Sequence, residues 1–486
     1  MANRLQKTTE DAIGIFQAGV NAVRADQLVS HRVRINGLRM EIDSSEGTIA
    51  WSFHPNGRLI VVGAGKATAG MLLGFSESIT GLDLNIPIVG HVNVPEGTAN
   101  RESTSISTQE RIRSVTVLEA RPAGLNEPTP LAVRGTKSIL ELCEMARPED
   151  TVVCLLSGGA SALLTSPIDG ITLAEKVQTT RVLSHRGATI EELNTVRRGL
   201  SNVKAGRLAR KCKAGRLITL VISDVLGDSL ATIGSGPTWE NDPPNIEQII
   251  SLLTKYDSKG DSIPRSIYET LGRLTTEASE SRSQSWLAKR FMKKEHKTPT
   301  EYSHVILANN ATAVDAAGVE AIHRGYSYWM ESARQSEGSA ESVGRRLARQ
   351  CIGLKEQPQI SCIISGGEPT VSLPPEDERG RGGRNQQLTL AGLQELEELR
   401  IPIAEWERMT LLSGGTDGED GPTDAAGAWC DANTIRSYQR QSLQPTEFLS
   451  RCDAYSFFDK TDSLFVTGPT HTNVCDLRVA IYDHSN

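Results

Sequence analysis

The chain has 486 residues, of which 38% are hydrophobic and 23% charged, so it is long enough for more than one core and too apolar for a disordered protein. Its formal net charge of −7 at pH 7 argues against a broad nucleic-acid-binding surface, because such a surface needs clustered lysines and arginines. No stretch approaches the roughly 18 consecutive apolar residues of a membrane-spanning helix, so the expected partners are small molecules rather than nucleic acid or a membrane.

The first predicted element is an amphipathic helix over residues 1–23. It includes Glu10 and Asp11 and lacks the apolar stretch of a signal peptide, so we interpret it as an ordinary helix. The eight cysteines lie far apart without a C-x-x-C pair, and several fall in strand-like runs. This pattern predicts buried, reduced thiols and a cytoplasmic location, with a mitochondrial form as an alternative if a different start adds a presequence.

From residue 58 onward, short apolar runs alternate with helical patterns. Each run begins with β-branched or leucine residues and stops at glycine, serine or asparagine. The runs cover residues 58–67, 151–160, 217–228, 304–311, 359–368 and 408–417. A repeated order of strand, glycine turn and helix is typical of parallel sheets with both faces covered, so the predicted fold class is α/β.

Two stretches interrupt this pattern. Residues 274–303 are polar and charged with little periodicity, which predicts a linker or surface excursion between a domain over residues 1–273 and an α/β domain over residues 304–486. Residues 373–385 contain two prolines followed by three glycines, which predicts a long loop in or beside the second domain.

The turn after the first run contains Lys66. It is not a P-loop, because Ala67 rather than serine or threonine follows the lysine, and it lacks the third glycine of the dinucleotide fingerprint, because position 68 is threonine. A lysine at the amino end of a helix is unfavourable unless an anion lies nearby. We therefore predict that Lys66 binds an anion; the alternative is a solvated lysine.

Ser-Gly-Gly recurs at the end of three apolar runs, at residues 157–159, 365–367 and 413–415. Glycine lets a ligand approach the backbone at the carboxyl end of a strand. Each pair of glycines has the alternative of a simple tight connection, but the three together favour a phosphate-bearing ligand.

Residues 188–210 are predicted as one helix with two rows of side chains. Leu193, Val196, Leu200 and Val203 form the apolar row. The polar row carries an amide, a guanidinium, a hydroxyl and an ammonium group and no acid, from Asn194, Arg197, Ser201 and Lys204. Such a row suits a carboxylate or phosphate, although a solvated basic face is the alternative.

The next run ends at Asp224 and Asp228 and leads into the glycine-rich loop Gly234, Ser235 and Gly236. Backbone amides of such a loop suit phosphate oxygens, and the aspartates suit Mg²⁺. The alternative for Asp224 is a helix cap or turn former.

Arg381 and Arg384 lie just before a predicted helix, where they are placed to neutralise a transferring phosphoryl group; the alternative for Arg384 is an ion pair across the domain interface. The last Ser-Gly-Gly leads into four acids, Asp417, Glu419, Asp420 and Asp424. These do not fit a calcium loop, because position twelve is Ala428. They predict a Mg-nucleotide site. His471 is expected to have a surface or hydrogen-bonding role, and no serine-hydrolase elbow occurs.

Several segments together resemble the two-domain glycerate kinases, an older label for which is hydroxypyruvate reductase, and most resemble the animal-type branch. The resemblance spans residues 58 to about 480 and is carried by LLSGGASALL, GATIEELNTVRRGLSNVKAGRLA, LVISDVLGDSLATIGSGPT, ISGGEPTV, GRGGRNQQLTLA, LSGGTDGEDGPTDAAGAW and TGPTHTNVCDLRVAI. It implies a Rossmann-like three-layer N-terminal domain, a smaller mixed-sheet α/β C-terminal domain and an active site in the cleft between them. Two departures from the family pattern are Lys-Ala-Gly at residues 204–206 and the segment 119–130.

The implied reaction is ATP-dependent phosphorylation of D-glycerate to 2-phosphoglycerate with Mg²⁺ or another divalent cation. The family's lysine falls on Lys66 and its arginine on Arg384. We expect these two residues, with Asp224 and Asp417, to be catalytic, and the two aspartates to bind the metal. The expected substrate-binding and ATP-binding residues are Ser157, Gly158, Gly159, Ser161, Asn194, Arg197, Lys204, Gly234, Ser235, Gly236, Gly366, Gly367, Glu368, Asn385, Gly414, Gly415, Thr470 and Asn473.

Three alternatives stay open. A reductase acting on hydroxypyruvate fits the Rossmann-like pattern but not the missing dinucleotide fingerprint. A non-catalytic anion-binding protein would bind nucleotide without turnover. The oligomeric state is open, with a homodimer as one alternative.

Overall fold

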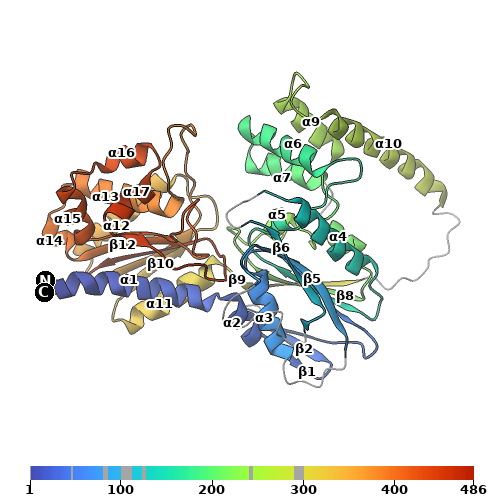
Figure 1. The fold of residues 1–486 in the computed structure, drawn as a ribbon. Helices are drawn as coiled ribbons and strands as arrows, with labels where there is room; N and C mark the ends of the chain where they lie inside the picture. Colours follow the sequence, from blue (N-terminus) through green and yellow to red (C-terminus); the bar gives the residue numbers. More distant parts are fainter. Residues whose placement is uncertain are drawn as a thin grey trace. The chain divides into compact units, whose positions relative to one another are not determined.

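The computed structural model describes residues 2–44, 47–79, 86–99, 112–122, 127–239, 245–288 and 300–485. The chain forms two compact units (Figure 1). Unit 1 comprises Met1–Val29, Ile222–Asp228 and Ile306–Asn486, and unit 2 comprises Ser30–Val221 and Ser229–Val305.

Unit 2 is built on a six-stranded sheet in the order β6-β5-β4-β7-β8-β9. The strands are β4 Leu59–Ala64, β5 Ile88–Pro95, β6 Val115–Arg121, β7 Thr151–Leu156, β8 Arg216–Ile222 and β9 Glu301–Ala308. Neighbours from β6 to β8 run parallel. Every residue of β4 and β7 is buried, as expected for central strands of a sheet covered on both faces. The predicted α/β class is confirmed.

The helices of unit 2 follow these strands in the predicted order. They are α3 Thr68–Ile79, α4 Pro130–Glu144, α5 Ala160–Leu163, α6 Leu173–His185, α7 Ile190–Gly199, α8 Arg207–Lys211, the 3₁₀ turn η3 Ile233–Ser235, α9 Ile246–Tyr256 and α10 Arg265–Ala288. Helix α2 Ala25–Arg32 precedes them and begins in unit 1. A small antiparallel sheet has the strands β1 Val33–Asn36, β2 Arg39–Ser44 and β3 Gly47–Ser52. Helices α6, α7, α9 and α10 enclose a separate apolar core and lie together in Figure 1.

A buried carboxylate fixes the starts of the two central strands of unit 2. Asp150 precedes β7 and accepts hydrogen bonds from the Arg58 backbone N–H at 2.8 Å, from Arg58 Nη2 at 2.7 Å and from the Arg147 backbone N–H at 2.8 Å. Burial of the carboxyl acts to raise its pKa, but the bonds from Arg58 and Arg147 outweigh this and lower the pKa to about 2.

The helix predicted over residues 188–210 is interrupted, which corrects the sequence-based prediction. Helix α7 ends at Gly199, and α8 starts only at Arg207. The Ser201 hydroxyl accepts from two backbone N–H groups of the intervening turn, including that of Lys204 at 3.3 Å, which competes with helical pairing. Ser201 and Lys204 therefore lie beyond the helix that carries Arg197.

The stretch predicted as a linker is partly helical. Helix α10 continues to Ala288, while residues 289–299 lie outside the described part of the chain. The loop predicted over residues 373–385 is present up to Gly383, because α13 begins at Arg384.

Unit 1 is built on a mixed six-stranded sheet in the order β10-β11-β15-β12-β13-β14. The strands are β10 Tyr328–Ser332, β11 Cys362–Gly367, β12 Met409–Gly415, β13 Gly427–Cys430, β14 Leu464–Phe465 and β15 Asp476–Tyr482. Only the β10–β11 pair among these described strands runs parallel. The helices are α1 Ala2–Ala22, α11 Asn310–His323, α12 Ala340–Gly353, the 3₁₀ turn η4 Leu354–Glu356, α13 Arg384–Glu398, α14 Ile403–Trp406, α15 Ala432–Arg440, α16 Pro445–Ser450 and α17 Ala454–Lys460.

The N-terminal helix belongs to unit 1, whereas the sequence placed residues 1–273 in one N-terminal domain. Helix α1 packs with α11 on one face of the unit 1 sheet, and the Phe16 ring lies edge-on to Phe465 with centroids 4.9 Å apart. Thr8 donates to or accepts from Thr410 on β12 at 2.9 Å. The apolar face of an amphipathic helix must be buried somewhere, and sequence periodicity does not say against which sheet.

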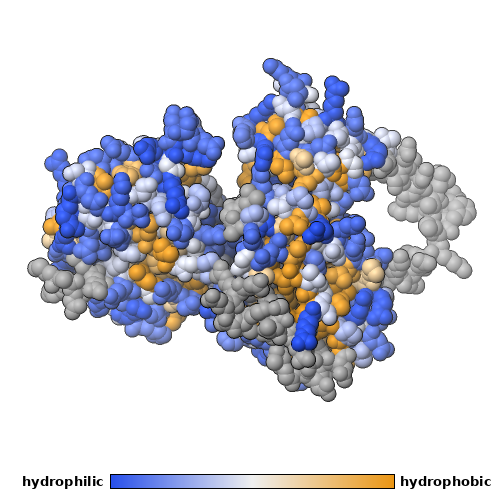
Figure 2. Space-filling view, viewed as in Figure 1, coloured by the Kyte–Doolittle hydropathy of each residue, from blue (hydrophilic) through white to orange (hydrophobic). Residues whose placement is uncertain are grey.

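The burial of the cysteines and the polarity of the surface both fit the amino-acid composition. All eight cysteines are free and buried, as predicted. Figure 2 shows mostly hydrophilic residues on the visible face of each unit, with apolar residues in smaller areas between them. None of the described helices combines the length and apolar composition that a membrane crossing requires.

Candidate functional site

In unit 2, the turn that carries Lys66 is hydrogen-bonded to the first Ser-Gly-Gly, residues 157–159. The Lys66 backbone N–H donates to Gly158 O at 2.7 Å, and the Ala67 N–H donates to Ser157 Oγ at 3.0 Å. Gly65 has φ +146°, and a Cβ there would lie 2.1 Å from Ser157 Oγ. Only glycine fits this approach, so the two predicted turns form one structure at the carboxyl ends of β4 and β7.

Two cationic side chains lie beside Gly159, the last residue of that Ser-Gly-Gly. A Cβ on Gly159 would lie 3.4 Å from Lys66 Cγ and 3.2 Å from Arg121 Nη2. Gly159 has φ +77° and precedes α5. A side chain at this position would therefore contact both Lys66 and Arg121.

Ser161 on α5 links the rest of the predicted anion-binding residues. Its hydroxyl accepts from Arg197 Nη2 at 3.1 Å and from Lys204 Nζ at 2.8 Å, and its carbonyl accepts from Lys204 Nζ at 2.8 Å. Ser161 Oγ also lies 3.2 Å from Ser235 Oγ, and Lys204 Nζ is 3.4 Å from Gly234 O. Arg197 and Lys204 thus converge although they do not share one helix.

The loop over Gly234, Ser235 and Gly236 has three consecutive residues in the left-handed region, with φ of 57°, 68° and 63°. The Ala205 N–H donates to Ser235 O at 3.0 Å, and the Gly206 N–H donates to Gly236 O at 2.7 Å. Ala205 itself has φ 53°. The unusual alanine of the Lys-Ala-Gly sequence therefore occupies a conformation that glycine adopts more easily.

No carboxylate among the described residues forms an ion pair with Arg197 or Lys204. Burial lowers the pKa of Lys204 well below its usual value, and the positive charges of Arg197, Lys176 and Arg198 act in the same direction. Burial also lowers the pKa of Arg197. Asn194 lies half-buried one turn before Arg197 on α7. This arrangement has an excess of positive charge and is suited to an anionic ligand.

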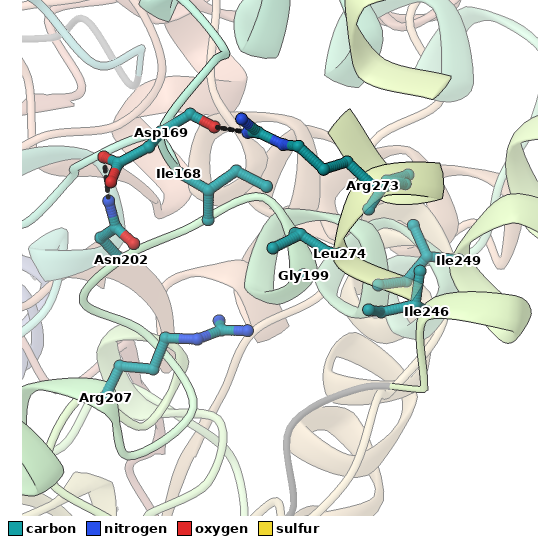
Figure 3. Close-up of a pocket in the computed structure, with 10 residues that line it drawn as sticks. Ile168, Asp169, Gly199, Asn202, Arg207, Ile246, Ile249, Arg273 and Leu274 are labelled. Atoms are coloured by element: carbon teal, nitrogen blue, oxygen red, sulfur yellow. Dashed lines mark hydrogen bonds between the residues drawn. The ribbon is translucent and has the colours of Figure 1, made fainter. Parts of the chain in front are cut away.

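A cavity of about 350 Å³ in unit 2 is lined in part by Gly199 of α7 and Arg207 of α8. Figure 3 shows isoleucine and leucine side chains from α9 and α10 along one wall. Its acidic residue is engaged, because Asp169 Oδ1 accepts from Asn202 at 3.3 Å and its backbone carbonyl accepts from Arg273 at 3.1 Å. The apolar wall makes this cavity less suited to a small anion than the surroundings of Ser161.

In unit 1, Arg384 is the first residue of α13 and is held by two acids. Its Nε and Nη2 donate to the two carboxylate oxygens of Asp476 at 2.7 and 3.0 Å, and Nη1 donates to Glu368 at 2.8 Å. Asp476 is fully buried. Arg384 therefore pairs within unit 1 by a bidentate, charge-assisted contact.

The second and third Ser-Gly-Gly sequences form the last residues of β11 and β12, on either side of Asp476. Gly367 and Gly415 each pair with Asp476 in the sheet. A Cβ on Gly366 would lie 1.9 Å from Asn310 Oδ1, and one on Gly367 would lie 1.8 Å from Glu337 Oε2. These glycines, with Gly414, make room for neighbours inside the unit, which corresponds to the tight-connection alternative.

Asn385 has a buried, positioning role. Asp420 accepts from the Asn385 backbone N–H at 3.0 Å and from the Gln386 N–H at 2.8 Å, so it caps α13. The Asn385 side chain is 1% exposed and accepts from Ser413 Oγ at 2.6 Å. Burial raises the pKa of Asp420 to about 7, against the effect of the two backbone N–H groups. Asn385 and Asp420 hold the start of the helix that presents Arg384.

Cys475 lies close to two of the remaining predicted acids, Asp224 and Glu368. Cys475 Sγ lies 2.9 Å from Asp224 O and 4.0 Å from Glu368 Oε2. Asn473 Nδ2 donates to Asp224 Oδ2 at 3.4 Å. Burial raises the pKa of Glu368; Arg384 opposes this, and the charges of Asp476 and Asp417 add to it. Segment 222–228 thus brings Asp224 to the acids of unit 1.

The β12–β13 loop positions Asp417. Its Oδ1 accepts from the Glu419 N–H at 3.1 Å, and its carbonyl accepts from the Thr470 N–H at 3.3 Å. The charges of Asp417 and Asp476 act on Glu368, and Arg384 pairs with Glu368 and Asp476. Hard carboxylate oxygens suit Mg²⁺, but no three His, Cys, Asp or Glu side chains of the described residues form a complete metal site. A cation held here would need oxygen ligands from phosphate or water.

The structure thus divides the predicted residues into two groups. Lys66, Ser161, Arg197 and Lys204 belong to unit 2, and the acids with Arg384 belong to unit 1. Sequence reasoning missed Arg121, Lys176 and Asp476. The signal for Asp476 and Arg121 was a charged residue at the end of an apolar strand, which needs a partner or a function when buried.

Two family models match parts of this chain. A family model described as "Domain of unknown function (DUF4147)" matches residues 11–272, and the MOFRL family model matches residues 361–476. The chain is 32% identical to a glycerate kinase of Danio rerio over 97% of both chains. It is 35% identical to a D-glycerate 2-kinase of Thermotoga maritima, over 75% of this chain and 80% of that one.

Two further likenesses bear on fold and activity. The chain is 33% identical to a putative hydroxypyruvate reductase of Agrobacterium vitis over 88% of both chains. A solved structure of a glycerate kinase from Thermotoga maritima superposes with a TM-score of 0.73 at 29% identity, covering 98% of this chain and 100% of that one.

Proposed function

The chain belongs to the glycerate kinase family, and from that premise we propose that it phosphorylates D-glycerate at the 2-hydroxyl, with ATP as phosphoryl donor and Mg²⁺ or another divalent cation. The observation that carries the proposal is the pair Arg197 and Lys204. Both donate to Ser161, and neither has a carboxylate partner among the described residues. A binding site for negatively charged groups is what a kinase of a hydroxy acid needs.

In this proposal the unit 2 residues bind the negatively charged parts of the substrates. Arg197 offers a planar fork that matches a carboxylate or phosphate, and Lys204 offers a point charge. Lys66 is placed beside Gly159, where a phosphate oxygen can approach the backbone. Their role is to orient the reacting groups, which is the main source of catalysis in phosphoryl transfer.

The unit 1 residues supply a fixed cation and several oxygen donors. Arg384 is held rigidly by Asp476 and Glu368, so little reorganisation is needed when it stabilises negative charge. Asp224 and Asp417 orient the substrate hydroxyl or hold a metal. A divalent cation, when bound, would neutralise phosphate charge.

A reductase is the second candidate because some relatives carry the name hydroxypyruvate reductase. The turn after β4 does not favour it. Thr68 occupies the position of the third fingerprint glycine, is fully buried, and its hydroxyl lies 3.3 Å from Ser157 Oγ. The space where a dinucleotide-binding turn brings helix and strand together is therefore filled by a side chain.

Phosphorus NMR of a reaction with ATP, Mg²⁺ and D-glycerate tests the proposal. The expected product signal is that of 2-phosphoglycerate, formed only when all three components are present. A product with the signal of 3-phosphoglycerate would contradict the site of transfer, and no ADP with any hydroxy acid would contradict kinase activity. Oxidation of NADH by hydroxypyruvate without ATP would establish the second candidate.

A further inference from the structure

Lys176 on α6 is a buried cation for which the described part of the chain supplies no hydrogen-bond partner. It is 4% exposed and lies on the same helix face as the buried Thr179 and Leu183. Its Nζ is buried and has no hydrogen-bond partner among the described residues. Burying an ammonium group without a counter-charge is costly, so such a group is retained only where something else compensates.

The neighbours of Lys176 are cations as well. Burial lowers the pKa of Lys176 to about 7, and the charges of Arg197 and Arg207 act in the same direction. Lys176 in turn lowers the pKa of Lys204. We refer to Lys176, Arg197, Lys204 and Arg207 as the cationic cluster. It is assembled from α6, α7, α8 and the turn between the last two.

Acids on the neighbouring segments are engaged with other groups. Asp169, which lines a cavity together with Arg207, accepts from Asn202 at 3.3 Å. Glu175 accepts from the Thr172 N–H at 2.7 Å, and Glu192 accepts from Lys255 at 2.7 Å. Asp257 pairs with Arg186 at 3.1 Å. No carboxylate of the described residues forms an ion pair with any member of the cationic cluster. The charge that balances this cluster must therefore come from a ligand or from loss of protons.

We propose that Lys176 is a positioning residue that takes up a proton when a multiply charged anion binds at Arg197 and Lys204, so that the site holds a phosphorylated hydroxy acid more tightly than the hydroxy acid itself. This inference rests on the proposed function for the identity of the two ligands. The proton comes from the buffer and adds to Nζ, and no bond of the ligand changes. Arg197, Lys204 and Arg207 are the charged groups that interact with Lys176 electrostatically, and Arg198 acts on Lys204.

The selectivity follows from charge. D-glycerate carries one negative charge, which Arg197 can balance alone. A phosphorylated hydroxy acid adds a phosphate, and its extra charge makes a protonated Lys176 favourable. Binding of the product relative to the substrate should therefore strengthen as the pH falls toward about 7 and level off below that, where Lys176 is already protonated in the free protein. Because Lys176 does not need to touch the ligand, it acts through the Arg197 side chain and the field of the cluster.

Calorimetric titration at pH 8 tests this, with 2-phosphoglycerate or D-glycerate added in buffers of different ionisation enthalpy. The dependence of the observed heat on the buffer gives the number of protons taken up. We expect about one proton for 2-phosphoglycerate and clearly less for D-glycerate in the unmodified protein. Lys176→Met should reduce this uptake by at least half and weaken 2-phosphoglycerate binding about tenfold. Lys176→Arg, always charged, should bind it without the linked proton.

A matched control is Lys137→Met on α4, the same chemical change at a side chain that is 77% exposed. It should leave uptake and affinity unchanged. Unchanged uptake and affinity in Lys176→Met would overturn the inference. A loss of stability in that variant would also count against it, because it would show that the ammonium group has a partner in the fold.

Titration with inorganic phosphate separates this inference from the proposed function, because it needs no turnover. Phosphate-linked proton uptake that depends on Lys176, in a protein that does not phosphorylate glycerate, would reject the function and support the cluster. Normal turnover without any dependence of proton uptake on Lys176 would support the proposed function and reject the inference about Lys176.

Discussion

The Arg384 guanidinium donates two hydrogen bonds to the fully buried carboxylate of Asp476, at 2.7 and 3.0 Å, and a third to Glu368. In the sheet, Gly367 at the end of β11 and Gly415 at the end of β12 each pair with Asp476. The contact fixes the direction in which the arginine points, so its effects on folding and on turnover are coupled.

Arg384→Ala is therefore expected to lose both stability and activity. Removal of one partner leaves Asp476 buried without a counter-charge, which should cost about 3–5 kcal/mol in free energy of unfolding. Turnover should fall about 100-fold or more, because a fixed cation near transferring charge is lost. Denaturant unfolding and steady-state kinetics measure the two effects. Arg381→Ala, in the same loop but 50% exposed, is the control and should change stability little.

Lys66→Ala separates catalysis from folding. The Lys66 backbone N–H, not its side chain, makes the contact with Gly158, so the turn should persist and the free energy of unfolding should change by no more than about 1 kcal/mol. We expect kcat to fall about 100- to 1,000-fold, with little change in the circular dichroism spectrum. Lys137→Ala is the control. Full activity in Lys66→Ala would remove this lysine from the mechanism.

Metal dependence should be traceable to Asp417. Treatment with EDTA is expected to abolish turnover and added Mg²⁺ to restore it. Asp417→Asn should raise the Mg²⁺ concentration for half-maximal turnover by about tenfold or more, since a charged oxygen donor becomes neutral. Asp424→Asn changes an acid of the same loop that is 70% exposed and near Arg381, and should leave that concentration unchanged. Equal Mg²⁺ requirements in the two variants would contradict the assignment.

Ala205→Gly is expected to stabilise the protein. Ala205 has φ 53°, where a Cβ costs roughly 1–2 kcal/mol, while glycine costs somewhat less than 1 kcal/mol through the freedom of the unfolded chain. The net gain should be about 0.5–1 kcal/mol, read as a small rise in the midpoint of thermal unfolding. Ala209→Gly, within α8, should instead lower the midpoint. A lower midpoint for Ala205→Gly would mean that the methyl group contributes packing that outweighs the backbone cost.

Asp150→Asn tests the carboxylate at the start of β7. The pKa of Asp150 is lowered from 3.8 to about 2 in the folded protein, so its charge stabilises the fold above the unfolded pKa, and this contribution is lost as the pH falls through about 2. The variant should lose about 2 kcal/mol at pH 7, and the difference from the unmodified protein should shrink between pH 4 and pH 2. Urea unfolding at several pH values measures this. A difference independent of pH would assign the effect to lost hydrogen bonds alone.

Local signals predicted the strands and the turns that carry several of the candidate site residues. The β4 and β7 runs, the turn at Lys66 and the start of α13 at Arg384 follow from apolar runs that end in glycine. The continuous helix through Lys204 was not correct, because the Ser201 hydroxyl and the left-handed residues 205–206 end it. Even so, Arg197 and Lys204 meet at Ser161, which shows that their residue types were more informative than their expected spacing.

Residues whose importance depends on distant partners could not be predicted in this way. Lys176 has no local sequence signal, and its burial close to Arg197 and Arg207 is apparent only in the folded structure. Asp476 is separated from Arg384 by 92 positions in the chain. The packing of α1 on the last sheet likewise depends on contacts between the two ends of the sequence.

The membership of α1 in unit 1 has a consequence for synthesis on the ribosome. Helix α1 is made well before β15, a central strand of the sheet that it covers. Unit 2 is complete by residue 305, so it can fold while the apolar face of α1 is still uncovered. On the nascent chain, α1 should therefore need protection until β15 has been made, and removal of β15 should leave that helix exposed to chaperones and proteases.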